Sequence, residues 1–125
     1  MAAGNWQIYN EFKKSMADGT LDLDGHTFYM ALFLSTSNCG DVALATAQYA
    51  TLTNQHSNAN GYTTGGASVG TGVWTRSSGT VTFDVSDATW TASGGSIVAR
   101  FAVIYSNTAT NKDLVCYCLL DSTPG

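Results

Sequence analysis

The stretch Ser96–Tyr105, SIVARFAVIY, constrains the fold of this chain more than any other. In an extended conformation, successive side chains point to opposite sides of the strand. Here both sides are apolar, and Arg100 is the exception. A strand that seeks burial on both sides belongs in the middle of a packed sheet, not at a wet edge. The sequence therefore predicts a β-rich core organised around this strand.

Two other segments, Thr27–Leu34 and Leu114–Leu120, are also apolar on both sides. We expect the first to neighbour the central strand in the same core. The second follows the central strand after the short polar stretch SNTATNKD, a length typical of a hairpin between antiparallel strands. These three strands should form the middle of the sheet.

Between them lies a glycine-rich region with weaker alternation. Ala67–Thr75 is predicted to be one strand, whose small residues on one side allow close approach of another backbone or an aromatic side chain. Arg76–Gly79 is predicted to be a hairpin turn. The next strand, Thr80–Val85, should turn its valines and phenylalanine inward. A short strand over Ala88–Thr91 would then place Trp90 in the core.

The N-terminal segment has a helical pattern. Asn5 is a candidate N-cap, and Trp6–Ala17 places Ile8, Tyr9, Phe12 and Met16 on one side. Asp18 and Gly19 supply the expected stop. We therefore predict one domain over residues 1–125. It is mainly β, an antiparallel β-sandwich or a jelly-roll-like barrel over 27–121, with one N-terminal amphipathic helix over 6–18.

Composition excludes some partners. The net charge is −4 and there are only five Lys and Arg residues, so a groove that follows nucleic-acid phosphates is not expected. Charged residues make up only 11% of the chain, which weakens electrostatic protection against association and favours a subunit covered by neighbours. The sequence has no apolar run long enough to cross a bilayer and no signal-peptide pattern, so we expect synthesis in the cytoplasm and no membrane partner.

The residues that could carry chemistry do not combine into a known site. Cys39, Cys116 and Cys118 are read as buried reduced thiols, and a disulfide or a zinc site with His26 and His56 remain weaker alternatives. Asp22 and Asp24 lack the other ligands of a calcium loop. Asp84 and Asp87, with Trp90 nearby, are a weak candidate for glycosidase-type acid–base work. The sequence predicts no enzyme, no cofactor and no metal.

The polar segment Ser35–Gly61 should be mostly loop, with one helical or extended turn. A long irregular stretch inside a small domain is typical of a binding surface or a subunit contact. His56 is expected at the surface. The candidate partner-binding residues in this segment are Gln48, Tyr49, Asn54, Gln55, His56, Asn58 and Asn60.

Arg100 needs a partner, because an unpaired guanidinium in the core would cost several kcal/mol. We expect Asp84 or Asp87 to supply it, or failing those a cluster of backbone carbonyls. If no acceptor lies within hydrogen-bond reach, Arg100 should point into a subunit contact.

Four sequence blocks together resemble a family of small structural proteins of tailed bacteriophages. The blocks are FYMALFLSTSN, YATLTNQHSNANGYTTGG, VTFDVSDATWTASGGSIVARFAVIY and LVCYCLLD, within Thr27–Asp121. The family pattern has an early A-L-[FY] strand, a T-N-E segment leading to G-Y-x-x-G-G, a D-x-x-W step and an A-R-x-A-x-I-Y strand. Gln55 stands where Glu is common. The resemblance also implies a further strand after the L-L-D step, so we expect the end at Gly125 to reflect a trimmed or incompletely visible tail.

The resemblance implies a virion structural protein, and a capsid decoration (cement) protein is the preferred role. Such a protein would bind the outer surface of the major capsid shell as a homotrimer, after synthesis in the host bacterial cytoplasm. Strands that are apolar on both sides, with one covering helix, would leave surface for neighbours to bury. The alternatives are a tail or neck (head-tail connector) component, and a carbohydrate-binding β-sandwich that uses Tyr62, Trp74 or Trp90 as an exposed platform.

Overall fold

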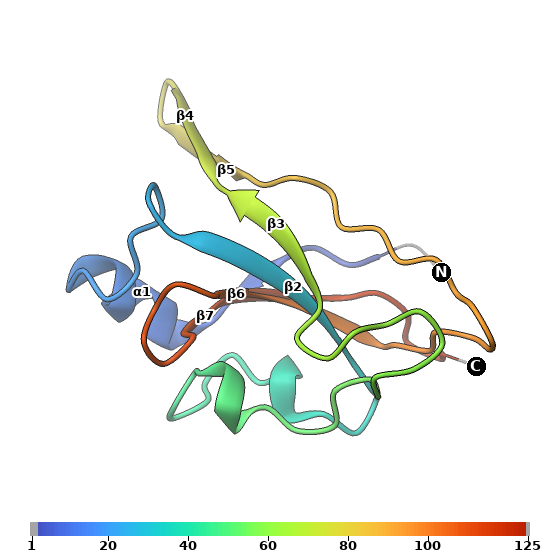
Figure 1. Ribbon diagram of the computed structural model, residues 1–125. Coiled ribbons are helices and arrows are strands. Elements are labelled where there is room, and N and C mark those ends of the chain that lie inside the picture. The colour runs from blue at the N-terminus through green and yellow to red at the C-terminus, as the bar shows by residue number, and fades with distance from the viewer. Residues whose placement is uncertain (1–2, 125) are drawn as a thin grey trace.

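The computed structural model describes residues 3–124 and consists of a five-stranded antiparallel sheet with other segments on both of its faces (Figure 1). The strand order in the sheet is β1-β7-β6-β2-β3, and β4 and β5 form a separate hairpin. The elements are β1 (Gln7–Ile8), α1 (Asn10–Ala17), β2 (Thr27–Phe33), η1 (Asn38–Gly40), η2 (Tyr49–Thr51), β3 (Ala67–Thr71), β4 (Val73–Ser77), β5 (Thr80–Asp84), β6 (Phe101–Ser106) and β7 (Leu114–Leu119).

The predicted central strand occupies the middle of the sheet. β6 pairs with β2 on one side and with β7 on the other, so that Ile104 lies between Met30 and Cys116. Regular pairing begins only near Arg100, whose amide donates to the Phe33 carbonyl. The residues before it are irregular, and Asn60 Nδ2 donates to the Ser96 carbonyl instead. The prediction of a central strand is confirmed, but its start is five residues later than expected.

The N-terminal helix is shorter than predicted. Trp6 to Tyr9 are extended, and the helix begins at Asn10 after an N-cap at Tyr9, not Asn5. The free edge of β7 explains the difference, because the Tyr9 amide donates to the Val115 carbonyl and Ile8 pairs with Cys116. These backbone partners compete with the first helical turn. The predicted end is correct, since Asp18 is the C-cap and Gly19 has a φ of +83°.

The predicted strand Ala67–Thr75 is two strands. β3 pairs with β2 in the large sheet, whereas β4 pairs with β5, and the chain leaves the sheet at Gly72. A Cβ at Gly72 would lie 1.8 Å from Cε1 of Phe83, so an aromatic ring does approach the backbone here, as the small residues predicted. The predicted hairpin turn is also confirmed: Ser77 pairs with Thr80 around Ser78 and Gly79.

The two faces of the sheet are covered by different parts of the chain (Figure 1). The 35–61 loop with η1 and η2 lies against one face, and the β4–β5 hairpin lies on the other side of the sheet. Residues 102–106 of β6 are all buried. The chain's own segments therefore cover β6, whereas β2 and β7 keep partly exposed residues, and burial of these strands by neighbouring subunits stays a prediction. The large apolar side chains that stay exposed are Trp6, Ile8, Met16, Val73 and Val81.

Three smaller expectations also need correction. Ala88–Thr91 forms no strand, and Trp90 is half-buried against Tyr62. Val81 is exposed because β5 leaves the body of the sheet. Arg100 donates from Nη1 to the Ser122 carbonyl over 2.8 Å, so a backbone oxygen takes the place of the expected aspartate.

The fold class is confirmed as mainly β with one helix. The two β-layers have a sandwich-like arrangement, and the described residues form no closed barrel.

Candidate functional site, a groove between the hairpin and the sheet

The predicted partner-binding loop is tied closely to the rest of the molecule. Tyr49 stacks on Tyr105 of β6 with ring centroids 4.6 Å apart. Its hydroxyl donates to Gln55 Oε1, and Gln55 Nε2 donates to the Tyr62 hydroxyl over 2.7 Å. The Tyr62 oxygen also accepts from the Leu32 amide of β2. Gln55 is thus the centre of an internal hydrogen-bond network, in which burial raises the pKa of both Tyr49 and Tyr62.

The other predicted residues of this loop also have intramolecular contacts. His56 is buried, contrary to expectation, with its ring edge-on to Tyr62 and Nδ1 2.7 Å from the Ser57 carbonyl. Gln48 pairs through its backbone with Asp113, which directly precedes β7. Further hydrogen bonds join Asn54 to Thr36, Asn58 to Thr64, and Asn60 to Ser96. These contacts account for the residue types within the fold, and binding of a partner at these residues stays a prediction.

A serine, a histidine and an aspartate lie close together at the base of the β6–β7 loop. Ser106 Oγ is 2.9 Å from His26 Nδ1, the Ser106 amide donates to the Asp113 carbonyl, and burial raises the pKa of the Asp113 carboxyl. Ser106 is fully buried and accepts a hydrogen bond from the Ala109 amide. A nucleophile must reach its substrate, and the buried Ser106 is instead occupied by contacts that close the loop.

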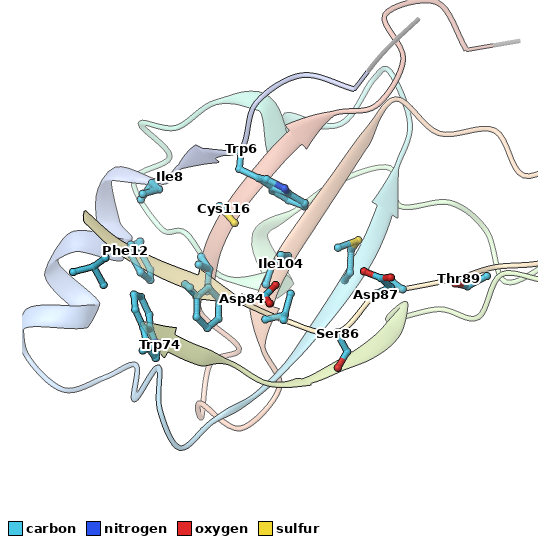
Figure 2. A pocket seen from close by; sticks show the side chains of 16 residues that line it. Trp6, Ile8, Phe12, Trp74, Asp84, Ser86, Asp87, Thr89, Ile104 and Cys116 are labelled. Atoms are coloured by element: carbon cyan, nitrogen blue, oxygen red, sulfur yellow. The ribbon is translucent and has the colours of Figure 1, made fainter. Parts of the chain in front are cut away.

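A groove with a volume of about 800 Å³ lies on the other face of the sheet. Its floor is formed by β2, β6 and β7, and its walls by β1, α1, β5 and the chain that follows β5 (Figure 2). Three of the five exposed large apolar side chains of the described residues border it. The lining residues are Trp6, Ile8, Phe12, Met30, Trp74, Val81, Phe83, Asp84, Val85, Ser86, Asp87, Ala88, Thr89, Ile104, Val115 and Cys116. We call this feature the hairpin groove.

The polar groups of the hairpin groove lie on one side. Asp84 ends β5, and Ser86, Asp87 and Thr89 follow it along the same wall (Figure 2). Lys14 with Asp18 is the one ion pair among residues 3–124, so neither wall carboxylate is neutralised by a cation. The rest of the lining is apolar or aromatic, and Trp74 stacks on Phe83 with centroids 4.8 Å apart. The hairpin groove therefore combines an apolar floor with a negative rim.

The thiol that lines the groove is not activated. Burial raises the pKa of the Cys116 thiol to about 12, so it is protonated near neutral pH and a poor nucleophile. All three cysteines are buried and free, which confirms the reading of reduced thiols. No three His, Cys, Asp or Glu side chains within residues 3–124 are placed to hold a metal ion.

Sequence reasoning missed this groove because it depends on where two distant segments cross. Trp6 and Ile8 were assigned to a helix, and Val81 to the core. Asp84 and Asp87 were noted only as possible acid–base residues or as partners of Arg100. The available signal was Trp6, a large apolar side chain outside the predicted stripe of Ile8, Tyr9, Phe12 and Met16.

No protein-family model, curated protein or solved structure matches the chain. In the described part of the chain, none of the helices is both long and apolar enough to span a membrane.

Proposed function

We propose that the chain is a structural protein of a tailed-phage virion, and specifically a capsid decoration protein that binds the outer surface of the major capsid shell. The observation that carries this proposal furthest is the exposed apolar border of the hairpin groove, formed by Trp6, Ile8 and Val81. Exposed apolar side chains gathered on one feature of a small protein are typical of a protein-binding surface. The resemblance to tailed-phage structural proteins supplies the identity of the partner.

The chemistry of the described residues supports a binding role. Ser106 is sealed, the Cys116 thiol is held protonated, and the wall carboxylates have no nucleophile beside them. A shell-binding protein needs no such chemistry. It stabilises a capsid through contact area and many modest interactions.

The test is addition of the purified protein to expanded capsids that lack it. The proposal expects saturable binding and a higher temperature of shell disruption, measured by light scattering and electron microscopy. A variant with Trp6→Ser and Ile8→Ser should bind more weakly, whereas Met16→Ser, an exposed apolar residue away from the groove, should bind as the parent does.

Absence of shell binding would contradict this role. Binding to isolated tails or necks would favour the alternative of a tail or head-tail connector component.

A homotrimer is the assembly that we propose on the shell, since decoration at local three-fold positions requires it. Sedimentation of the free protein, and reconstruction of decorated shells, would count the copies directly. A ring of another symmetry would again favour the tail or neck.

A carbohydrate-binding role receives little support from the geometry. Tyr62 is buried, and Trp90 packs on it with centroids 5.9 Å apart. Trp74 belongs to a different cluster, where its Nε1 donates to the Leu23 carbonyl. The three rings do not share one exposed platform.

A further inference from the structure

We propose that the hairpin groove is a strand-accepting site: an extended segment of another polypeptide, with alternating apolar side chains and a Lys or Arg, pairs with the free edge of β5. The segment's apolar side chains would face the floor of the groove, and its cation would lie beside Asp84 or Asp87. This proposal does not depend on the virion role.

Among residues 3–124, one edge of β5 is unpaired. Within the described residues β5 pairs with β4 alone. Ser77 and Thr80 flank the two-residue turn, and such a turn is closed by a hydrogen-bonded pair. Hydrogen-bonded and non-hydrogen-bonded pairs then alternate along the hairpin, so the amides and carbonyls of Val81 and Phe83 point away from β4. These groups form a template that another strand can extend.

The position of that edge also favours strand addition. In Figure 2, β5 lies between β4 and the side of the groove that carries Trp6 and Ile8. The second layer of the sandwich therefore has a vacant strand position beside β5, above β6 and β7. β5 has five residues, so a matching segment of that length would span about 17 Å at ~3.4 Å per residue.

Charge selects another polypeptide over a second copy of this chain. The groove rim carries two carboxylates without a cation. In a second copy, only the five basic residues could form ion pairs with these carboxylates, and each of them lies in a folded element or a short loop. These residues are Lys13 and Lys14 in α1, Arg76 in β4, Arg100 bonded to Ser122, and Lys112 bonded to Asn107.

Arg76 comes nearest to an extended apolar segment, but its strand is not free to enter a groove. Trp74, two residues earlier, is held by its stacking on Phe83 and its hydrogen bond to Leu23 of the same copy. Moving β4 into another molecule would break both contacts. The occupant is therefore a separate segment that brings its own cation.

The test uses a defined probe and the intact chain. The probe is a fluorescent seven-residue peptide in which three valines alternate with two threonines between terminal lysines, and the matched peptide has glutamates at both ends. The lysine peptide should bind at least about ten times more tightly, because like charges at a rim oppose binding. With Asp84→Asn and Asp87→Asn together, the two peptides should differ by less than about threefold. Equal binding of both peptides to the parent protein, or no saturable binding up to about 1 mM, would overturn the proposal.

A second pair of variants tests the strand edge. Val81→Pro removes the amide that points away from β4 and should abolish peptide binding, with folding checked by circular dichroism. Val81→Thr should weaken binding, and Val73→Thr is its control because Val73 is equally exposed on the same hairpin, at 60% against 59%, but does not line the groove. Equal effects of the two threonine variants would contradict the proposed site.

Amide hydrogen exchange separates the possible occupants. Strand addition should protect the Val81 and Phe83 amides when the lysine peptide binds. Protection of both amides in the free protein that increases with protein concentration would mean that a second copy occupies the groove, and would overturn the proposal. Peptide binding without added protection at these two amides would mean that the groove accepts apolar side chains but no strand, which would also overturn it.

Discussion

The two faces of the sheet are covered in different ways. On one face, the 35–61 loop is held by specific contacts: Tyr49 stacks on Tyr105, and Gln55 joins two tyrosine hydroxyls. On the other, the β4–β5 hairpin leaves a groove of about 800 Å³ with exposed apolar walls. We call them the closed face and the groove face. A long polar loop thus packs closely on one face, while the proposed binding surface lies on the face where the second layer is incomplete.

The substitution that should destabilise the protein most is on the closed face. Tyr105 is 2% exposed, stacks on Tyr49 and donates to the Gly65 carbonyl. Tyr105→Ala should lower the free energy of unfolding by about 3–5 kcal/mol, because it leaves a large cavity and orphans a carbonyl. Ile8→Ala on the groove face should cost less than about 1 kcal/mol, since that side chain is half exposed. Urea denaturation of both variants measures the contrast, and similar losses would mean that the groove wall is as well packed as the closed face.

The second prediction concerns the hydrogen-bond network around Gln55. Gln55→Leu should cost about 1–3 kcal/mol, because the hydroxyls of Tyr49 and Tyr62 lose their shared partner. Gln55→Glu should be tolerated near neutral pH, since a carboxylate can accept from both hydroxyls while Tyr62 still accepts from the Leu32 amide. Thermal unfolding of the pair measures this difference. Equal destabilisation by Leu and Glu would show that shape, not hydrogen bonding, holds the loop.

Asp113, at the edge of the closed face, should make the stability of the folded protein depend on pH. Burial raises the pKa of its carboxyl above the unfolded value, and Oδ2 has no hydrogen-bond partner in the structure. Because the folded protein favours the protonated form, this group adds stability below its unfolded pKa and loses that contribution as the pH rises through the folded pKa. Asp113→Asn should therefore raise stability at pH 7 by roughly 1 kcal/mol and change it little at pH 3. Urea midpoints at the two pH values test this, and an unchanged difference between them would contradict it.

The smallest expected effects on stability are on the hairpin. Val81→Thr and Val73→Thr should each change the free energy of unfolding by less than about 0.5 kcal/mol, because both side chains are mostly exposed. Denaturant titration measures this. A loss above about 1.5 kcal/mol for Val81→Thr would show that Val81 already packs as a core residue and that the groove is closed in solution.

Periodicity predicted the parts of the fold that follow from local pattern. Segments that are apolar on both sides of an extended strand identified β2, β6 and β7 and their pairing. Ser78 and Gly79 indicated the hairpin turn. Periodicity failed where the conformation of one segment depends on a strand edge that is distant in the sequence. Ile8 fits a helical stripe, but it forms a strand because its backbone pairs with the edge of β7 at Cys116. Likewise, local alternation made Val81 a core residue, although the break at Gly72 carries the hairpin away from the sheet.

The candidate site shows the same division. The polar 35–61 loop stays a predicted partner-binding segment, but its asparagines and Gln55 also form hydrogen bonds within the fold that the sequence did not predict. The hairpin groove joins residue 6 to residue 89 across the sheet. No pattern within one segment could report that juxtaposition, which arises only when the chain crosses from one layer to the other.

Amide hydrogen exchange of the free, dilute protein tests most directly whether one face is closed and the other lacks a strand. The account predicts that the Val81 and Phe83 amides exchange at least about ten times faster than that of Thr82, which points toward β4, while the amides of β2 and β6 exchange slowest of all. Protection of Val81 and Phe83 equal to that of Thr82 in the monomer would contradict it, because the edge of β5 would then already be paired.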